Sequence, residues 1–195
     1  MSSEPRKDPT ASQAIDFFHL LFSLKQTKRT GWVKRGVKAP ESIADHMYRM
    51  GMMAMFAGEA GVDAGRAIKV ALVHDVAEAI VGDIAPGDGV SDADKYAREA
   101  AAMERIREML GGQDVALASE VVQLWREYED QATPEAVFVK DLDKLEMILQ
   151  AHEYEAEQDM ALQEFFDSTR GKFKTDVGKR WAEEICRRRD ERRSS

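Results

Sequence analysis

Cysteine, long apolar runs and positive charge are all scarce in this chain, and each scarcity excludes a class of protein. Cys186 is the only cysteine among 195 residues, so an intramolecular disulfide cannot form, which suits a reducing compartment. No apolar stretch approaches the roughly 20 residues that span a bilayer. Lysine and arginine total 28 against 36 acidic residues, and a net charge of −8 disfavours a general binder of duplex nucleic acid. We therefore expect a cytoplasmic protein that binds neither nucleic acid nor membranes. An organelle stays open if a targeting peptide has been removed.

The hydrophobic pattern predicts an all-α fold, a single-domain helical bundle. An apolar content of 44% and a charged content of 33% are typical of a soluble globular protein, and neither a repeat nor an alternating strand pattern is found. Helices are expected over residues 12–27, 43–60, 64–79, 92–110, 114–129, 134–158 and 176–190. The expected limits are a disordered lead-in over 1–11, the helical domain over 12–190, and a tail over 191–195.

The dipeptide His74-Asp75 is the most informative feature of the sequence. It ends an apolar helical run over residues 67–73, where it offers adjacent nitrogen and oxygen donors to one cation. In a continuous helix, Glu78 would follow one turn later on the same face. A histidine packed in the core would explain the dipeptide equally well without any ligand.

His46 and Asp143, on two other predicted helices, complete a possible set of four metal ligands with His74 and Asp75. Two imidazoles and two carboxylates suit a divalent ion such as Mn, Fe, Co, Ni or Zn. Helical bundles build such sites from side chains on facing helices. Spacing alone does not distinguish Asp143 from Asp141, because apolar residues flank both acids.

Four motifs in this order resemble the HD-domain metal-dependent phosphohydrolases, and in particular their 5′-deoxynucleotidase branch. They are PESIADHMYRM at 40–50, ALVHDVAE at 71–78, GDIAP at 82–86 and VKDLDKLEM at 139–147. The resemblance runs from about Phe17 to Glu157. It implies a homodimer that uses one divalent metal ion (Mn, Co, Fe, Ni, Zn or Mg) to hydrolyse deoxyribonucleoside 5′-monophosphates to deoxynucleosides and phosphate.

The resemblance also implies a role for each matching residue. The implied metal ligands are His46, His74, Asp75 and Asp143, the catalytic acids are Glu78 and Asp83, and the substrate-binding residues are Trp32, Glu41 and Ile43. Family members can carry an arginine directly before the tryptophan, but here Thr30-Gly31 precedes it. The phosphate-binding cation is therefore open between Arg29, Lys34 and Arg35, with Arg29 the first choice. Asp141 would then be a surface acid or an acid behind the ligands.

Two other functions are consistent with parts of this pattern. A different HD-domain phosphohydrolase, acting on a cyclic nucleotide, a triphosphate or a signalling nucleotide, would share the ligands but need other phosphate contacts. A non-enzymatic helical module with a decayed site is disfavoured, because all four ligands and both acids are present.

Overall fold

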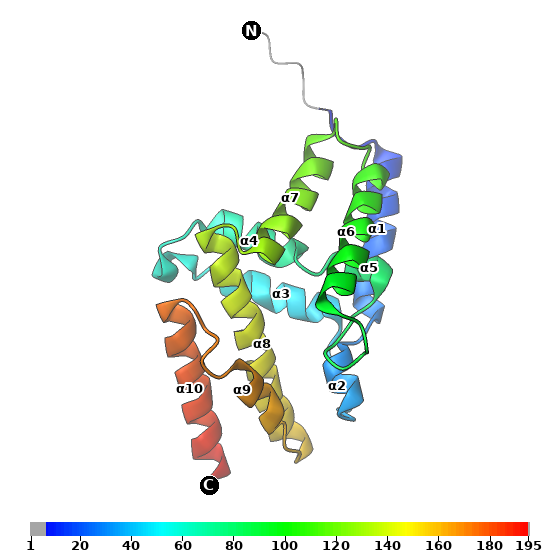
Figure 1. Ribbon diagram of the computed structural model, residues 1–195. Coiled ribbons are helices and arrows are strands. Elements are labelled where there is room, and N and C mark those ends of the chain that lie inside the picture. The colour runs from blue at the N-terminus through cyan, green and yellow to red at the C-terminus, as the bar shows by residue number, and fades with distance from the viewer. Residues whose placement is uncertain (1–6, 195) are drawn as a thin grey trace. The chain divides into compact units, whose positions relative to one another are not determined.

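Helices form nearly all of the regular structure in a computed structural model, which describes residues 7–194 (Figure 1). Two isolated β-bridges, Lys7 with Val115 and Lys28 with Ser42, are the only strand-like pairings among the described residues. The helices are α1 (Ala11–Gln26), α2 (Thr30–Lys34), α3 (Ile43–Ala54), the 3-10 helix η1 (Ala57–Ala60), α4 (Ala64–Val73), α5 (Glu78–Val81), α6 (Asp92–Met109), α7 (Ala116–Asp130), α8 (Pro134–Gln158), α9 (Gln163–Thr169) and α10 (Asp176–Arg193). The all-α prediction is confirmed.

Contacts group these helices into two compact units. The first comprises residues up to 47 together with 73–127, and the second comprises 48–72 together with residues from 128 onward. Both α3 and α7 begin in the first unit and end in the second. Within the part of the chain that the structure describes, none of the helices combines the length and apolar character that crossing a membrane requires.

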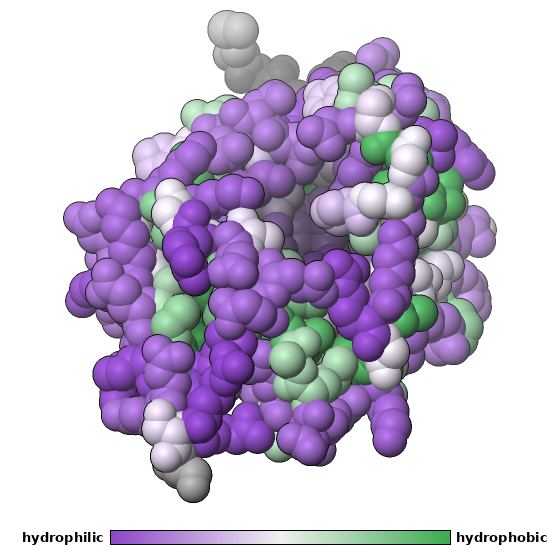
Figure 2. Space-filling view, turned by 60° about the horizontal axis from the view of Figure 1, so that its bottom comes forward, coloured by the Kyte–Doolittle hydropathy of each residue, from purple (hydrophilic) through white to green (hydrophobic). Residues whose placement is uncertain are grey.

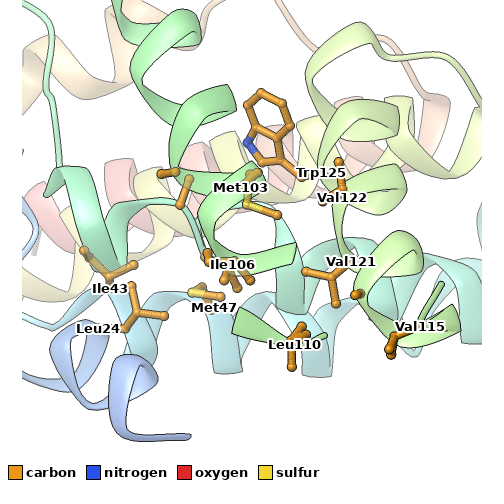
Figure 3. Packing of buried hydrophobic residues seen from close by; sticks show 14 residues of the cluster. Leu24, Ile43, Met47, Met103, Ile106, Leu110, Val115, Val121, Val122 and Trp125 are labelled. Atoms are coloured by element: carbon orange, nitrogen blue, oxygen red, sulfur yellow. The ribbon is translucent and has the colours of Figure 1, made fainter. Parts of the chain in front are cut away.

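The first unit is built around α1, α5 and α6, which contact one another. Helix α1 begins at a capping box, because Thr10 Oγ1 accepts from the Gln13 amide while the Gln13 side chain accepts from the Thr10 amide. The core side chains that Figure 3 labels are Leu24, Ile43, Met47, Met103, Ile106, Leu110, Val115, Val121, Val122 and Trp125. This packing fixes α3, α5 and α6, the elements that carry the candidate site in this unit.

The second unit is organised by α8, against which α9 and α10 pack. Thr133 caps α8 by accepting from the Ala136 amide, and Pro134 occupies the first helical position. Near the other end of α8, Glu155 forms a buried two-pronged ion pair with Arg189 of α10, with N–O distances of 2.6 and 2.7 Å. The Arg189 guanidinium also stacks on the Phe166 ring of α9, 3.8 Å from its centroid. The ion pair thus ties the three helices together.

The buried ion pair makes the stability of the second unit depend on pH. Burial raises the pKa of Glu155, but hydrogen bonds from Arg189 and the Leu162 amide outweigh burial and lower it below its ordinary value of 4.5. The stabilisation is therefore complete above about pH 4.5 and is lost as the pH falls through the lower folded-state pKa. We expect a Glu155→Gln variant to lose less stability between about pH 6 and pH 3.5 than the parent protein, as measured by urea unfolding. Parallel losses in both proteins would contradict this role.

Three elements in the first half and near the C-terminal part of the chain differ from the sequence prediction. Residues 28–40, expected to be a loop, contain the five-residue helix α2, and the helix expected over 43–60 ends at Ala54. Helix α9 forms where the sequence predicts none. Helices α2 and α9 have five and seven residues. Helices this short owe their helicity to tertiary packing rather than to a sequence signal.

The chain ends also differ from the prediction in part. Helix α10 continues to Arg193, beyond the predicted end of the helix over 176–190, while the predicted domain limits stay predictions. An ion pair between Arg187 and Glu191, one turn apart, supports the last turns, and arginines are favoured at a helix C-terminus. Of the expected lead-in, residues 1–6 lie outside the described residues, and α1 begins at Ala11.

The surface is polar on the face shown in Figure 2. Hydrophilic side chains predominate there, and apolar side chains form small patches between them. This distribution agrees with a chain of which one third is charged.

Candidate metal centre

His74 and Asp75 lie in a tight turn between two helices. Helix α4 ends at Val73, and the next residues are held by bonds three residues apart, from the Val76 amide to Val73 O (3.0 Å) and from the Glu78 amide to Asp75 O (3.0 Å). Glu78 then opens α5. The predicted continuous helix over 64–79 is therefore wrong, because this turn is wound more tightly than an α-helix.

The turn and α3 bring three potential metal ligands together. His46 is fully buried on α3, and His74 is 3% exposed. The Nε2 atoms of His46 and His74 lie 3.8 and 3.1 Å from the same oxygen, Asp75 Oδ2. The ring centroids are 5.4 Å apart with an interplanar angle of 63°. The sequence prediction that these residues share one site is consistent with this geometry.

This donor set fits a divalent cation. One ligand atom from each of the three residues lies within 4.8 Å of the others. Metal–nitrogen and metal–oxygen bonds of about 2.0–2.2 Å bring the donors of one ion to such separations. Two imidazoles and a carboxylate suit a first-row divalent ion, and three protein ligands leave positions for water and substrate.

The charge of Asp75 is stabilised by its neighbours. Burial raises the pKa of this carboxyl, but His74, Arg29 and His46 together lower it well below the ordinary range. Arg29 Nη1 lies 3.2 Å from Asp75 Oδ2. Asp75 is thus ionised at neutral pH, as a metal ligand must be.

Glu78 has the opposite electrostatic character. It is 3% exposed, and its Oε2 atom has no hydrogen-bond partner among the described residues. Burial, followed by the charges of Asp75 and Asp83, raises the pKa of Glu78 well above its ordinary value. A buried carboxyl with a raised pKa beside possible metal ligands is a candidate for acid–base chemistry.

Asp83 fastens the predicted phosphate-binding loop to the segment after α5. Its carboxylate accepts from the Thr30 amide, and its carbonyl oxygen accepts from Thr30 Oγ1 at 2.8 Å. Because Arg29 directly precedes Thr30, these bonds help to hold the guanidinium beside Asp75. Asp83 therefore has a positioning contact, and its catalytic role stays a prediction.

The predicted substrate-binding residues differ in their surroundings, because some are buried and others are exposed. Trp32 is 2% exposed and donates from Nε1 to Glu41 Oε1 at 2.8 Å. Ile43 is fully buried in the core of the first unit. Lys34 pairs with Asp88 in the loop that follows α5, and Arg35 is exposed at the end of α2. The substrate contacts of these residues stay predictions.

Asp141 and Asp143 differ sharply in their surroundings within the second unit. Asp141 is fully buried and accepts hydrogen bonds from the Lys174 amide, the Thr175 amide and Thr175 Oγ1. A Cβ atom at Gly178 would lie only 2.6 Å from Asp141 Oδ2, so α10 begins directly against this carboxylate. The expectation of a surface acid is therefore wrong for Asp141, and the alternative of an acid behind the ligands stays a prediction. Asp143 is half-buried and accepts from Tyr128 Oη at 2.7 Å, and its role as a ligand stays a prediction.

An Asp141→Ala substitution is expected to lower the free energy of unfolding by about 3–5 kcal/mol. It removes a buried charge and leaves the backbone amides of Lys174 and Thr175 without their acceptor. Chemical denaturation measures the loss, and Asp130→Ala, at the exposed end of α7, is the control. A loss below about 1 kcal/mol would show that Asp141 is not the anchor of α10.

Lys95 of α6 is a neighbour of the site that the sequence does not reveal. Its ammonium lies 3.5 Å from Glu99, and its charge lowers the pKa of Glu78. In sequence it is one lysine in a charged amphipathic helix, and such lysines are usually solvated. Helix α6 packs against α5, and the sequence pattern does not show this packing.

Known proteins resemble this chain in both sequence and fold. A family model described as HD domain matches residues 21–185, which include segments of both units. The 5′-deoxynucleotidase HDDC2 of Danio rerio is 54% identical over 161 residues, covering 82% of this chain and 79% of that protein. The PH0347 protein of Pyrococcus horikoshii OT3 has a solved structure that matches with a TM-score of 0.72 and 32% identity, covering 90% of this chain and 97% of that one. The structure of a predicted metal-dependent phosphohydrolase from Magnetospirillum magnetotacticum MS-1 matches with a TM-score of 0.69 and 25% identity, covering 92% of each chain.

Proposed function

This chain belongs to the HD-domain family, and we propose that it is a metal-dependent 5′-deoxynucleotidase, which hydrolyses deoxyribonucleoside 5′-monophosphates to deoxynucleosides and phosphate. The observation that carries the proposal is the convergence of His46, His74 and Asp75 beside the buried carboxyl of Glu78. Relatives named 5′-deoxynucleotidase are about half identical to this chain over most of its length, which supports the reaction class.

His46, His74 and Asp75 would hold the divalent ion, and the family motif adds Asp143 as a fourth ligand. The ion supplies Lewis acidity, which lowers the pKa of a water molecule and offsets the negative charge of the phosphoryl group. Mn, Co, Fe, Ni, Zn and Mg are the candidates, because ligand type alone does not select one of them.

Glu78 would handle the proton of the reaction. Water attacks phosphorus and gives up a proton, the bond from phosphorus to the 5′-oxygen breaks, and that oxygen takes up a proton as it leaves. The raised pKa of Glu78 favours a carboxyl that holds a proton and can give it to the leaving oxygen. Arg29, already beside Asp75, is the first choice from the basic loop to pair with a phosphoryl oxygen.

Selection for deoxyribose would come from the segment around Trp32, Glu41 and Ile43. The Trp32 indole nitrogen and the Glu41 carboxylate already pair with each other, and Ile43 is apolar. A ribose 2′-hydroxyl placed against such a wall would lose its hydrogen bonds with water, which costs binding energy.

Phosphate release from a panel of nucleotides tests the proposed function. Purified protein would be given dAMP and AMP at equal concentrations with added Mn²⁺, Co²⁺, Mg²⁺ or Zn²⁺. We expect faster release from dAMP, and equal rates would contradict the deoxy preference. A cyclic nucleotide, a deoxynucleoside triphosphate and a signalling nucleotide complete the panel, and turnover of one of these instead of dAMP would favour the alternative HD-domain phosphohydrolase.

We also propose a homodimer located in the cytoplasm. The dimer follows from the family resemblance, and the location from the single cysteine, since the chain forms no intramolecular disulfide. Light scattering of the purified protein would test the dimer, and a mass of about 22 kDa, that of one chain, would contradict it.

A further inference from the structure

The guanidinium of Arg29 lies beside the donors of the candidate metal centre. Its Nη1 atom is 3.2 Å from Asp75 Oδ2, the oxygen that also faces the Nε2 atoms of His46 and His74. The Arg29 side chain keeps 17% of its surface exposed, so solvent still reaches it. A guanidinium in this position can pair with the phosphoryl group of a nucleotide that approaches the ion.

Two other segments of the first unit hold the backbone around Arg29. The Arg29 amide donates to the Glu41 carbonyl oxygen at 3.1 Å. The Thr30 amide donates to the Asp83 carboxylate, and Thr30 Oγ1 donates to the Asp83 carbonyl oxygen at 2.8 Å. Thr30 therefore bonds to both the side chain and the main chain of a residue 53 positions later in the sequence. These bonds join α2 to the loop between α5 and α6 (Figure 1).

The local sequence gives this segment little stability of its own. Helix α2 has only five residues, and a helix of that length is not stable alone in water. Gly31, which follows Thr30, loses more conformational freedom on folding than any other residue type would. The bonds from Thr30 to Asp83 thus supply an anchor that the helix itself does not provide.

We propose that Thr30 is a positioning residue for substrate phosphate: through its hydrogen bonds to Asp83, it holds Arg29 where the guanidinium meets the phosphoryl oxygens. This rests on the proposed function and adds to it a residue that acts through Arg29. A loop that is fixed in its binding conformation before the substrate arrives binds more tightly, because less freedom is lost on binding. Small displacements of a group that orients a substrate can also slow the reaction considerably.

A double-mutant cycle on the Mn²⁺-loaded protein tests the proposal. Thr30→Val removes the hydroxyl and keeps the shape of the side chain, Arg29→Gln removes the guanidinium, and a third variant combines both changes. The measured quantities are the affinity for inorganic phosphate, from calorimetric titration, and KM and kcat for dAMP. Thr30→Ser, which keeps a hydroxyl, is the conservative variant.

Thr27→Val is the matched control for the loss of a threonine hydroxyl. Thr27 Oγ1 donates to the Ser23 carbonyl oxygen at 3.0 Å, at the end of α1 and only three residues before Thr30. This variant loses a hydrogen bond of similar length in the same part of the chain. Its phosphate affinity and its kinetics should match those of the parent protein.

For Thr30→Val we expect the phosphate dissociation constant and KM to rise by about three- to tenfold, since one neutral hydrogen bond is lost. Thr30→Ser should retain most of the phosphate affinity. In the Arg29→Gln background, Thr30→Val should cause no further loss, because no guanidinium remains to be positioned. Equal losses in both backgrounds, or no loss in Thr30→Val, would overturn the proposal, since a purely structural hydroxyl acts independently of Arg29.

The two levels of the proposal fail in different ways. If the parent protein binds phosphate but hydrolyses no deoxynucleotide, the proposed function fails, and the titration still decides the role of Thr30. If the parent hydrolyses dAMP, but Arg29→Gln or Thr30→Val matches it in KM and phosphate affinity, only the positioning role is excluded. If the parent does neither, both levels fail. If Thr30→Val does not fold, Thr30→Ala takes its place in the cycle, and the same outcomes decide.

Discussion

Replacement of Glu78 by glutamine is expected to slow phosphate release from dAMP by about 10²–10⁴-fold, the usual contribution of general acid–base catalysis. Glutamine keeps the size of the side chain but can neither store nor release the proton that the leaving 5′-oxygen needs. Glu78 is buried and its pKa is raised, so it holds its proton at a higher pH than an exposed glutamate does. Steady-state kinetics with dAMP measures the loss.

Metal binding must survive this substitution for the interpretation to hold. The metal content of Glu78→Gln, measured after dialysis, should equal that of the parent protein, because His46, His74 and Asp75 are unchanged. Glu157→Gln, at an exposed position of α8, is the control for removal of a carboxylate and should leave turnover intact. Turnover at the parent rate in Glu78→Gln would remove Glu78 from the mechanism.

Replacement of His74 by alanine is expected to weaken metal binding by more than about 100-fold, since loss of an outer partner of a metal ligand already costs about 10–100-fold. The imidazole contributes one of the three donors that converge within 4.8 Å. Turnover should fall to a similar degree at limiting metal and recover in part when metal is added in excess. Calorimetric titration of the metal-free protein with Mn²⁺ or Co²⁺ gives the affinity.

Removal of a histidine elsewhere separates ligation from general effects on the protein. His19→Ala, at an exposed position of α1, should bind metal as the parent does. Circular dichroism should show that His74→Ala keeps its helices, because the loss of a buried side chain also lowers stability. If folded His74→Ala binds metal with unchanged affinity, His74 is not a ligand.

Sequence patterns predicted the long elements well because their end signals are local. Thr133-Pro134 marks the start of α8, and the predicted helix over 134–158 has the observed bounds. The break between Val73 and Glu78 has no such signal, because the turn contains neither glycine nor proline. Tertiary packing imposes it, and periodicity does not report tertiary packing.

Sequence motifs predicted several residues of the candidate site. They could not predict the roles that depend on contacts between residues far apart in the sequence. His46 and the pair His74-Asp75 lie close enough to hold one ion, which agrees with the prediction from the motif order. Asp141 is distinguished from Asp143 by hydrogen bonds to Lys174 and Thr175, more than 30 residues away in sequence. Periodicity cannot show such contacts, so only the structure shows that Asp141 anchors α10.

Phosphate release from dAMP before and after removal of metal tests the central claim most directly. The protein is stripped with a chelator, assayed, and assayed again after addition of Mn²⁺ or Co²⁺. A metal-dependent 5′-deoxynucleotidase loses its activity on stripping and regains it on addition of metal, with dAMP preferred to AMP throughout. Full activity in the stripped protein, or no activity on dAMP with any divalent ion, would contradict the claim.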